Sequence, residues 1–211
     1  MSAVSKRHEN KLNRGGVKLI AGVDESGIGP LAGPVIAAAV ILDDSKKIKN
    51  IDDSKKLTSQ KREELYSIIM DSALSVGIGI IDNQIIDQIN ILQASLLAMR
   101  HAVSSLSVKP NHVLVDGIRT IPKVNIPQTA IKHGDSSSYL IAAASIIAKV
   151  MRDRIMNNYD QIYPNYNFSL HKGYGTEDHM NKLKKFGPTH IHRLSYQPVM
   201  DCLALNGYII L

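Results

Sequence analysis

The chain has 211 residues, of which 44% are hydrophobic and 21% are charged, with a formal net charge of +6 at pH 7. This length can bury one sizeable core but not two full domains. The excess of Lys and Arg favours an anionic partner such as nucleic acid, because a basic surface attracts phosphates. The longest apolar run, Val35–Leu42, falls far short of the roughly 20 residues that span a bilayer, and Met1–Arg14 has no apolar stretch like that of a signal peptide.

Cysteine usage points to a reducing compartment. The single cysteine, Cys202, cannot form an internal disulfide, and we expect a partly buried, inert thiol. We therefore expect a soluble, cytoplasmic protein without a membrane segment, and a monomer.

The beginning of the chain predicts a flexible lead-in followed by strands. Residues 1–16 are charged, lack periodicity and end in two glycines. Short apolar runs at Lys18–Val23 and Val35–Leu42 predict two strands, and the Gly- and Pro-rich segment between them predicts a long turn. A helix over Thr58–Met70, with Thr58 as its cap, and a strand over Ala73–Ile81 follow.

Helices and strands alternate in the rest of the chain. The further elements that we expect are a helix at Asn90–Leu106, strands at His112–Val115 and Thr129–Lys132, a long helix at Ser138–Asn158 and a helix near Glu177–Phe186. Strands mixed with helices predict an α/β domain.

Two adjacent carboxylates, Asp24 and Glu25, follow the first strand and precede a glycine-rich turn. Neighbouring side chains of a continuing strand point to opposite faces, so we expect the strand to end here and the turn to bring both carboxylates together. Glycines also let backbone N–H groups approach a phosphate or a sugar. The alternative is an ordinary solvated turn.

Further aspartates stand where a carboxylate site would need them. Asp116 follows the strand at His112–Val115, and Asp135 precedes the long helix, with a role as a helix cap alone as the alternative. Carboxylates that meet at one sheet edge form the hard-oxygen site that Mg²⁺ or Mn²⁺ prefers. Asp153 lies about 15 residues along the same helix, over ~20 Å from its start, so it cannot share a metal pair with Asp135. Because the arginines beside it offer an ion pair, we assign Asp153 to a structural or supporting role.

A basic and aromatic segment near the C-terminus has the composition of a nucleic-acid contact. Tyr174 stands between two glycines and can stack on a sugar or base, with Lys172 and Thr176 placed to reach phosphate. The pair Lys55-Lys56 can contact a phosphate backbone or form a solvated face. His190, His192 and Arg193 add polar reach farther along the chain, with a structural role as the alternative for the two histidines.

Together these segments closely resemble ribonuclease HII of bacteria, a type 2 ribonuclease H, from about Leu19 to Val199. The matching runs are Ala21–Ala39, Asp53–Leu57, Asn90–Ala102, Val115-Asp116-Gly117, Gly134-Asp135, Ala142–Asp153, His171–Thr176 and Gly187–Val199. The resemblance implies a ribonuclease-H-like mixed sheet flanked by helices, with a C-terminal helical extension. We expect a catalytic domain over residues 17–199, its extension beginning at about residue 160, and a tail over residues 200–211.

The resemblance also implies the functional residues. Asp24, Glu25, Asp116 and Asp135 look like the four acids that hold two Mn²⁺ or Mg²⁺ ions and the hydrolytic water. Tyr174 resembles the tyrosine that recognises the junction between a ribonucleotide and a deoxyribonucleotide, and the turn Gly27-Ile28-Gly29 resembles the loop that senses the 2′-hydroxyl, the group that distinguishes RNA from DNA. This chain departs from the family at two positions: Ile28 replaces the arginine that is usual between the two glycines, and Ile118 replaces the asparagine that is usual after Asp116-Gly117.

The implied activity is endonucleolytic hydrolysis of the RNA strand of RNA–DNA hybrids and nicking 5′ of ribonucleotides embedded in duplex DNA, leaving 3′-hydroxyl and 5′-phosphate ends. Such an enzyme removes misincorporated ribonucleotides from DNA. Two alternatives remain at this point: a hybrid-binding protein with little catalysis, motivated by Ile28 and Ile118, and ribonuclease HIII, which normally carries an additional N-terminal substrate-binding domain.

Overall fold

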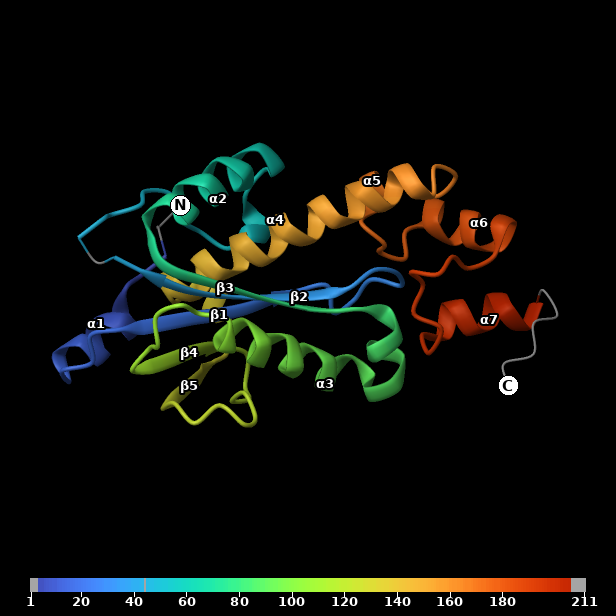
Figure 1. Ribbon diagram of the computed structural model, residues 1–211. Coiled ribbons are helices and arrows are strands. Elements are labelled where there is room, and N and C mark those ends of the chain that lie inside the picture. The colour runs from blue at the N-terminus through green and yellow to red at the C-terminus, as the bar shows by residue number, and fades with distance from the viewer. Residues whose placement is uncertain (1–3, 44, 206–211) are drawn as a thin grey trace.

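A computed structural model describes residues 4–43 and 45–205. Five strands form one mixed sheet in the order β3-β2-β1-β4-β5 (Figure 1). The strands are β1 (Ile20–Ser26), β2 (Val35–Leu42), β3 (Ala73–Ile81), β4 (His112–Asp116) and β5 (Gln128–Ile131). β1, β2 and β3 pair antiparallel, whereas β4 runs parallel to β1, and β5 parallel to β4. The α/β fold class with a mixed sheet is therefore confirmed.

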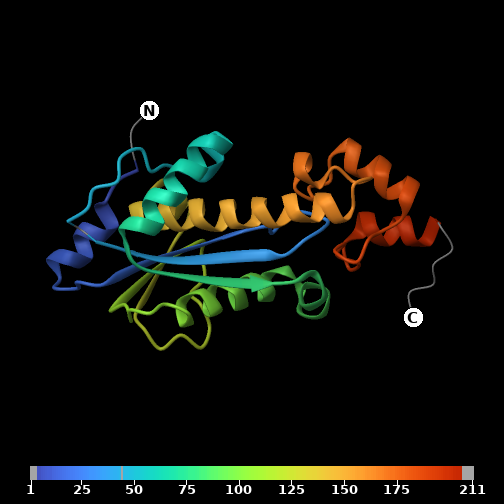
Figure 2. The same ribbon diagram turned by 45° about the horizontal axis from the view of Figure 1, so that its top comes forward.

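Helices cover both faces of this sheet. The helices are α1 (Arg7–Arg14), α2 (Ser59–Ser72), α3 (Asn83–Ser104), α4 (Tyr139–Ile162), α5 (Phe168–His171), α6 (Glu177–Phe186) and α7 (Gln197–Leu205), with short 3₁₀ turns η1 (Ser54–Lys56) and η2 (Gly134–Ser136). α2 and α4 lie over one face and α3 over the other, while α5, α6 and α7 gather beyond one end of the sheet (Figures 1 and 2). This group is the expected C-terminal helical extension. Among the described residues, no helix combines the length and apolarity needed to cross a membrane.

The two faces of β2 explain how the core is divided. Ala38 and Val40 belong to the apolar cluster under α4, and Ala37 and Ala39 to the cluster under α3. Successive strand residues point to opposite faces, so a strand that is buried on both sides is apolar throughout. Because small residues line the sheet, α4 packs very close to it: a Cβ on Gly22 would lie 2.2 Å from the backbone carbon of Leu140.

The predicted helices and strands are largely confirmed, with two differences in the first half of the chain. β1 extends to Ser26 rather than ending at Val23. The helix expected from Asn90 is the second part of α3: Asn90 has φ 64°, and its side chain accepts a hydrogen bond from the Gln93 N–H at 3.1 Å, as a helix cap does. An earlier part of α3, starting at Asn83 and capped by Asp82, was missed.

The N-terminal segment differs from the expected flexible lead-in. Residues 7–14 form helix α1, and its buried Glu9 accepts hydrogen bonds from the Ser138 hydroxyl at 2.6 Å and from the Leu140 N–H at 3.0 Å. A carboxylate at the start of α4 satisfies N–H groups that lack partners within the helix. The partners of this contact are about 130 positions apart in the sequence, so no local pattern predicts it.

The C-terminal end also differs from expectation. The segment from Met200 to Leu205 continues α7, and was expected to be a tail. Cys202 is buried, as expected, and its thiol donates to the Leu183 carbonyl oxygen at 3.1 Å. The rest of the expected tail, residues 206–211, lies outside the described residues.

Candidate active site

Asp24 and Glu25 are neighbours near the end of β1, where this strand still pairs with β2. They are paired with Ala38 and Ala37, so the strand continues through both acids, contrary to the expectation that it ends before them. Both nevertheless line one cavity of about 190 Å³, together with Ser26, Gly27, Ile28, Gly29, Ser54, Lys55, Lys149 and Tyr174. Asp24 is only 5% exposed. The two carboxylates share this cavity although the strand runs through both of them, so the turn that follows does not bring them together.

Asp116 reaches the same sheet edge from β4. β1 and β4 are parallel and their pairing ends at Val23 and Val115, so Asp24 and Asp116, which follow this pair, lie next to each other where the two strands separate. One oxygen of Asp116 accepts a hydrogen bond from the Gly134 N–H at 2.6 Å. This bond ties the end of β4 to η2.

Asp135 is the fourth acid, and it is buried in η2. Its Oδ2 atom lies 3.0 Å from Nζ of Lys55. The cap of α4 is Ser138, whose hydroxyl accepts from the Ile141 N–H, so Asp135 does not cap the helix. Its carboxylate is therefore available to the cluster of Asp24, Glu25 and Asp116.

The four acids strongly influence one another. Burial, and next the charges of Glu25 and Asp116, raise the pKa of Asp24 well above its ordinary value. Burial and the charge of Asp116 raise the pKa of Glu25 to about 7. Burial and the charge of Asp135 also raise the pKa of Asp116. Asp24, Glu25 and Asp116 thus resist ionisation next to one another, as expected where several like charges share a low-dielectric site.

The carboxylates are not closed into a ligand cage. Within residues 4–43 and 45–205, no three His, Cys, Asp or Glu side chains are already grouped so as to hold a metal ion. Asp24 accepts from the Glu25 N–H, and Asp116 and Asp135 have the partners described above. Oε2 of Glu25 is buried without a hydrogen-bond partner in the described part of the chain. Such an oxygen is costly unless a cation or a donor meets it.

Two buried arginines hold the turn that follows Glu25. Nη2 of Arg193 donates to the carbonyl oxygens of Gly27 and Gly33, Nη1 donates to that of Ile28, and the Tyr196 hydroxyl also donates to Ile28. Arg193 is completely buried, and was expected only to add polar reach. The bonds run from donors near the C-terminus to carbonyl groups near the N-terminus, so sequence spacing gives no signal for them.

Arg152 supports the same turn from α4. Its Nε donates to the Pro34 carbonyl oxygen at 3.1 Å and its Nη2 to that of Ala32 at 3.1 Å. Gly27 has φ +109°, and a Cβ at this position would lie 2.4 Å from Nε of Arg152. The turn therefore needs glycine here, both for its backbone conformation and for the space taken by the guanidinium group.

The two lysines that were expected to contact phosphate, Lys55 and Lys56, lie in different surroundings. Lys55 lines the cavity, whereas Lys56 lies 3.7 Å from Asp52 and does not. Lys149 also lines the cavity, and sequence reasoning missed it. Its Nζ donates to Asp153 at 2.6 Å, and Arg62 lies 3.6 Å from the same carboxylate.

Asp153 thus has an ion-pair role, as expected, but with partners other than those expected. The neighbouring arginines that we assigned to it are bound elsewhere: Arg152 to the turn, and Arg154 to Glu63 at 2.5 Å. Through Asp153, Lys149 is linked to Arg62, which also donates to the Ser54 carbonyl oxygen at 3.0 Å. This network connects α4 to the segment that carries Lys55.

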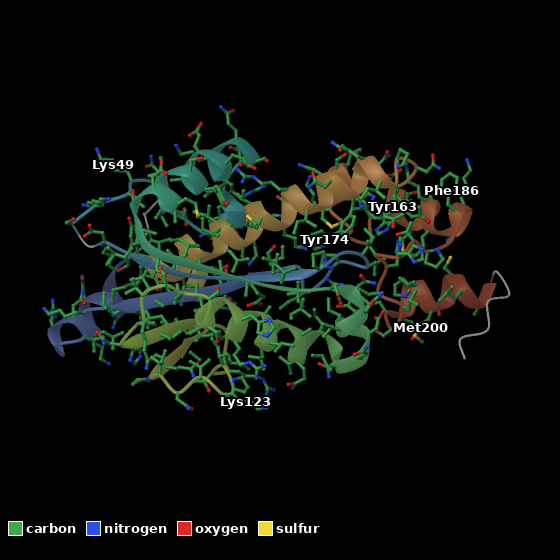
Figure 3. All side chains as sticks on the ribbon, viewed as in Figure 1. Lys49, Lys123, Tyr163, Tyr174, Phe186 and Met200 are labelled. Carbon is green, nitrogen blue, oxygen red and sulfur yellow. The ribbon has the colours of Figure 1, made fainter. Side chains whose placement is uncertain are left out.

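Tyr174 lines the cavity, whereas Lys172 and Thr176, the other two expected contacts of this segment, do not. The ring is 42% exposed, and the guanidinium carbon of Arg152 lies 5.8 Å from its centroid. Figure 3 shows Tyr174 between α4 and the sheet. Nζ of Lys172 bonds to Asn157 and to the Ser169 carbonyl oxygen, and the Thr176 hydroxyl caps α6 by accepting from the His179 N–H at 3.3 Å. Lys172 and Thr176 therefore have structural contacts in this arrangement.

A buried histidine cluster holds the segment of Tyr174. The His179 and His192 Nε2 atoms are 3.0 Å apart, and the rings of His171 and His179 are stacked at 4.3 Å. Nδ1 of His179 is 2.9 Å from the Tyr174 carbonyl oxygen. His192, for which a structural role was one of two alternatives, is thus structural, while His190 is exposed.

Comparison with known proteins agrees with this architecture. A family model described as Ribonuclease HII matches residues 21–199. Ribonuclease HII of Geobacter metallireducens is 53% identical over 196 residues, covering 93% of this chain and 92% of that protein. Ribonuclease HII of Geotalea daltonii is 56% identical over 186 residues, covering 88% and 86%. The crystal structure of ribonuclease H2 from Pyrococcus horikoshii OT3 superposes with a TM-score of 0.75 at 26% identity, covering 89% of this chain and 98% of that one.

The mixed sheet, its helical extension and these matches define a ribonuclease H, an enzyme that cuts the RNA strand of RNA–DNA hybrids internally. Within that class, the chain belongs to the ribonuclease HII family. Membership of this family favours an enzyme over a hybrid-binding protein with little catalysis, and ribonuclease HII over ribonuclease HIII.

Proposed function

We propose that this ribonuclease H also nicks duplex DNA on the 5′ side of an embedded ribonucleotide, leaving 3′-hydroxyl and 5′-phosphate ends. The proposal places catalysis in the domain of residues 17–199, with Asp24, Glu25, Asp116 and Asp135 as the functional acids. The observation that carries it is the convergence of these carboxylates, at the ends of β1 and β4 and in η2, beside a glycine turn held by two buried arginines.

The acids fit divalent metal ions. Carboxylate oxygens are the ligands that Mg²⁺ and Mn²⁺ prefer, and a buried oxygen of Glu25 has no partner among the described residues. The raised pKa values of Asp24 and Glu25 have burial and neighbouring negative charge as their causes, and a cation would offset both. We therefore propose that these four acids hold two ions, as Mn²⁺ or Mg²⁺. Bound ions of this kind lower the pKa of an attacking water and stabilise a leaving oxygen.

The residues around the acids position the substrate in this proposal. Lys55 and Lys149 present positive charge at the cavity, where a phosphodiester would otherwise be repelled by the carboxylates. Asp135 has Lys55 as its counter-charge before substrate arrives, and that lysine can exchange the carboxylate for a phosphate oxygen. The Asp153 network keeps Lys149 and the Lys55 segment at fixed positions.

Recognition of the ribonucleotide would pass through the turn. In the described part of the chain, the N–H groups of Ile28 and Gly29 have no hydrogen-bond acceptor, while the carbonyl group of Ile28 is held by Arg193 and Tyr196. These N–H groups are available for a phosphate or a 2′-hydroxyl. Tyr174 lies next to Gly29 and offers an exposed ring for stacking on the neighbouring sugar.

The side chain of Ile28 contributes no charge to this recognition. It is 45% exposed at the cavity, and Ile118 is 75% exposed after the end of β4. We propose that the rigid backbone of the turn reads the ribonucleotide, and that Ile28 lowers affinity without changing the reaction. Ile28→Arg then lowers KM on a duplex with one ribonucleotide, while kcat stays the same.

The experiment that tests the proposal uses two duplexes, one with a single ribonucleotide and one with a long RNA stretch, in Mg²⁺ or Mn²⁺. We expect the wild type to nick the first on the 5′ side of the ribonucleotide, and Asp24→Asn to lose activity on both by at least about a thousandfold. Asp71→Asn, an exposed aspartate of α2, serves as the matched control. Full activity of Asp24→Asn would refute the metal-site assignment, and cleavage of the long RNA stretch alone would refute the nicking activity.

The substrate also indicates a biological role. An enzyme that nicks DNA beside ribonucleotides starts the removal of misincorporated ribonucleotides and other RNA from DNA. We propose that it does so in the cytoplasm of a bacterial cell, where DNA and a reducing environment occur together, in keeping with a single cysteine.

A further inference from the structure

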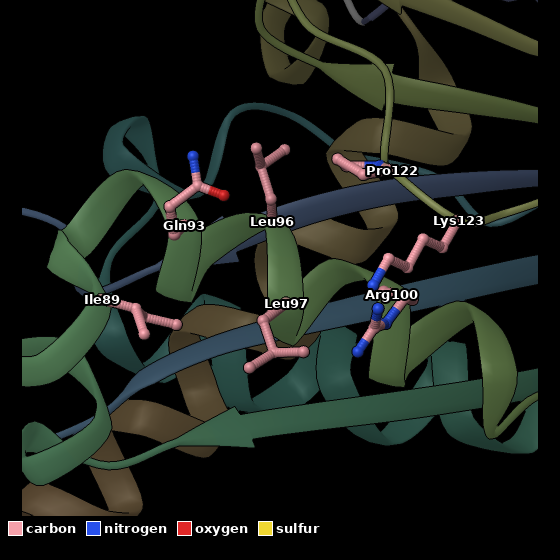
Figure 4. Close-up of a pocket in the computed structure, with 7 residues that line it drawn as sticks. All are labelled: Ile89, Gln93, Leu96, Leu97, Arg100, Pro122 and Lys123. Carbon is pink, nitrogen blue, oxygen red and sulfur yellow. The ribbon is translucent and has the colours of Figure 1, made fainter.

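A second cavity lies on the other side of the sheet, between α3 and the connection from β4 to β5. It has a volume of about 290 Å³. Figure 4 shows its lining, which consists of Ile89, Gln93, Leu96, Leu97 and Arg100 from α3 with Pro122 and Lys123 from the connection. None of these residues lines the cavity of Asp24 and Glu25.

The floor of this cavity is aliphatic. Ile89, Leu96 and Leu97 are only partly buried, and they pack on their inner side against the apolar cluster under α3. A neighbouring cavity of about 360 Å³ shares Lys123 and lies at the C-terminal end of α3, where Leu106, Val124 and Ile126 line it. The two form an apolar groove along the outer side of α3, which we call the α3 groove.

The rim of the α3 groove is positively charged. Arg100 and Lys123 come from different elements, and in the described ranges neither has an acidic partner within ion-pair distance. Lys109 lines the continuation. Between residues 88 and 134 the sequence has the cations Arg100, Lys109, Arg119, Lys123 and Lys132, and Asp116 is the sole acidic residue.

The same segment also lacks the groups that bind unpaired bases. Residues 88–134 include no Phe, Tyr or Trp. Proteins that bind single-stranded nucleic acid combine a basic groove with aromatic rings on which bases stack. An aliphatic floor with a cationic rim instead suits a peptide that has apolar anchors and acidic flanks, since the anchors fill the floor and the acids meet the rim.

We propose that the α3 groove is a docking surface for a protein partner that presents an acidic segment with leucine or similar aliphatic side chains. These side chains fill the floor of the groove. α3 lies on the face of the sheet opposite α4, the helix that supplies Lys149 to the active-site cavity (Figure 1). The partner therefore binds while the nucleic-acid substrate is engaged. Its binding recruits the nuclease to a site of action without entering the chemistry.

The test uses methyl NMR of the whole chain, with isoleucine and leucine methyl groups labelled. The probe is a short synthetic peptide of leucines flanked by glutamates. We expect saturable shifts at Ile89, Leu96 and Leu97. The double variant Arg100→Glu/Lys123→Glu should weaken binding by at least about tenfold, and a peptide with lysine in place of each glutamate should bind this variant better than the wild type.

Matched controls separate this surface from general charge. Lys47→Glu/Lys49→Glu makes the same charge change on exposed residues of another surface, and Figure 3 shows Lys49 and Lys123 on opposite sides of the molecule. This variant should bind the acidic peptide like the wild type, and both double variants should cleave a hybrid at the wild-type rate. The proposal is overturned if the peptide shifts none of these methyl groups, if the Arg100→Glu/Lys123→Glu variant binds it as tightly as the wild type, or if a DNA duplex without ribonucleotides shifts them instead.

Discussion

Nζ of Lys55 lies 3.0 Å from Oδ2 of Asp135, although 80 positions separate the two residues in the sequence. This ion pair joins η1 to η2. Arg62 of α2, paired with Asp153 of α4, holds η1, and Asp116 at the end of β4 holds η2. The pKa of Lys55 is raised, because its hydrogen bond and attraction to Asp135 outweigh the opposing effect of partial burial. Lys55 therefore keeps its positive charge beside the acids at neutral pH.

The role of Lys55 can be separated from that of the acids by Lys55→Met. Its charge lowers the pKa of Glu25, and it faces the place of the substrate phosphate. We expect KM to rise by about tenfold or less, since the side chain is largely exposed and the lost interaction is screened by solvent. The acid limb of the pH–activity profile should move to higher pH.

Lys56→Met is the matched control, because Lys56 pairs with Asp52 outside the cavity. It should leave both the KM and the pH profile close to those of the wild type. Steady-state kinetics on a hybrid from pH 6 to 9 makes the comparison. Equal effects of the two substitutions would show that Lys55 acts only through general positive charge.

The pH dependence of stability follows from Glu25. Its pKa rises from 4.5 to about 7 on folding, so between these values the folded chain binds the proton more tightly than the unfolded chain. Protonation of Glu25 thus stabilises the fold fully below about pH 4.5, and this contribution is lost as the pH rises through 7. Without divalent ions, the stability of the wild type relative to Glu25→Gln should fall with pH by on the order of 1 kcal/mol per unit in this range.

Denaturant unfolding in EDTA at several pH values measures this difference. Adding Mn²⁺ should restore the stability of the wild type at pH 8 more than that of Glu25→Gln, since the ion takes the place of the proton. A difference between the two proteins that does not change with pH would contradict the assignment of the raised pKa to Glu25.

Arg193 should be important for both stability and activity. Its guanidinium group is completely buried and donates to three carbonyl groups of the glycine turn. Arg193→Lys keeps the charge but cannot supply these bonds together, so we expect a loss of about 2–4 kcal/mol in the free energy of unfolding. At temperatures where the variant remains folded, KM should rise because the turn is no longer fixed.

Arg154→Lys provides the control for Arg193. Arg154 pairs with Glu63 at the surface, where an ion pair contributes little. We expect a change within about 0.5 kcal/mol and normal kinetics. Urea unfolding of the two variants decides the matter, and similar losses would mean that the turn does not depend on Arg193.

Acid should loosen the segment that carries Tyr174. Burial, assisted by neighbouring histidines, lowers the pKa of His179 to about 4 and that of His192 to about 3. The unfolded segment takes up protons at an ordinary pKa of 6.5, so the neutral histidines stabilise the fold above this pH. This stability is progressively lost as the pH falls from 6.5 towards 4.

Amide hydrogen exchange, corrected for its intrinsic pH dependence, can follow this effect. Protection of α6 should decrease between pH 6.5 and 4 while that of β2 stays the same. His190→Gln, which changes an exposed histidine of the same region, should behave like the wild type. Equal protection of α6 at both ends of this range would refute the role of the histidine cluster.

The sequence by itself determined much of the fold and the place of the site. Local patterns placed β2, β3 and α6 correctly, because alternating or periodic apolar residues and caps such as Thr58 act within a few positions. The same patterns indicated that Asp24, Glu25 and Asp116 lie at strand ends, and the parallel pairing of β1 with β4 brings those ends together.

Only the tertiary structure decided what surrounds these acids. Arg193 holds a turn that lies about 160 positions away, Lys149 reaches the cavity from the middle of α4, and Glu9 bonds to the start of the same helix. Lys172 and Thr176 turned out to be bound within the helical extension. Buried polar groups must find partners wherever the packed chain offers them, and that choice depends on the assembled fold rather than on spacing along the sequence.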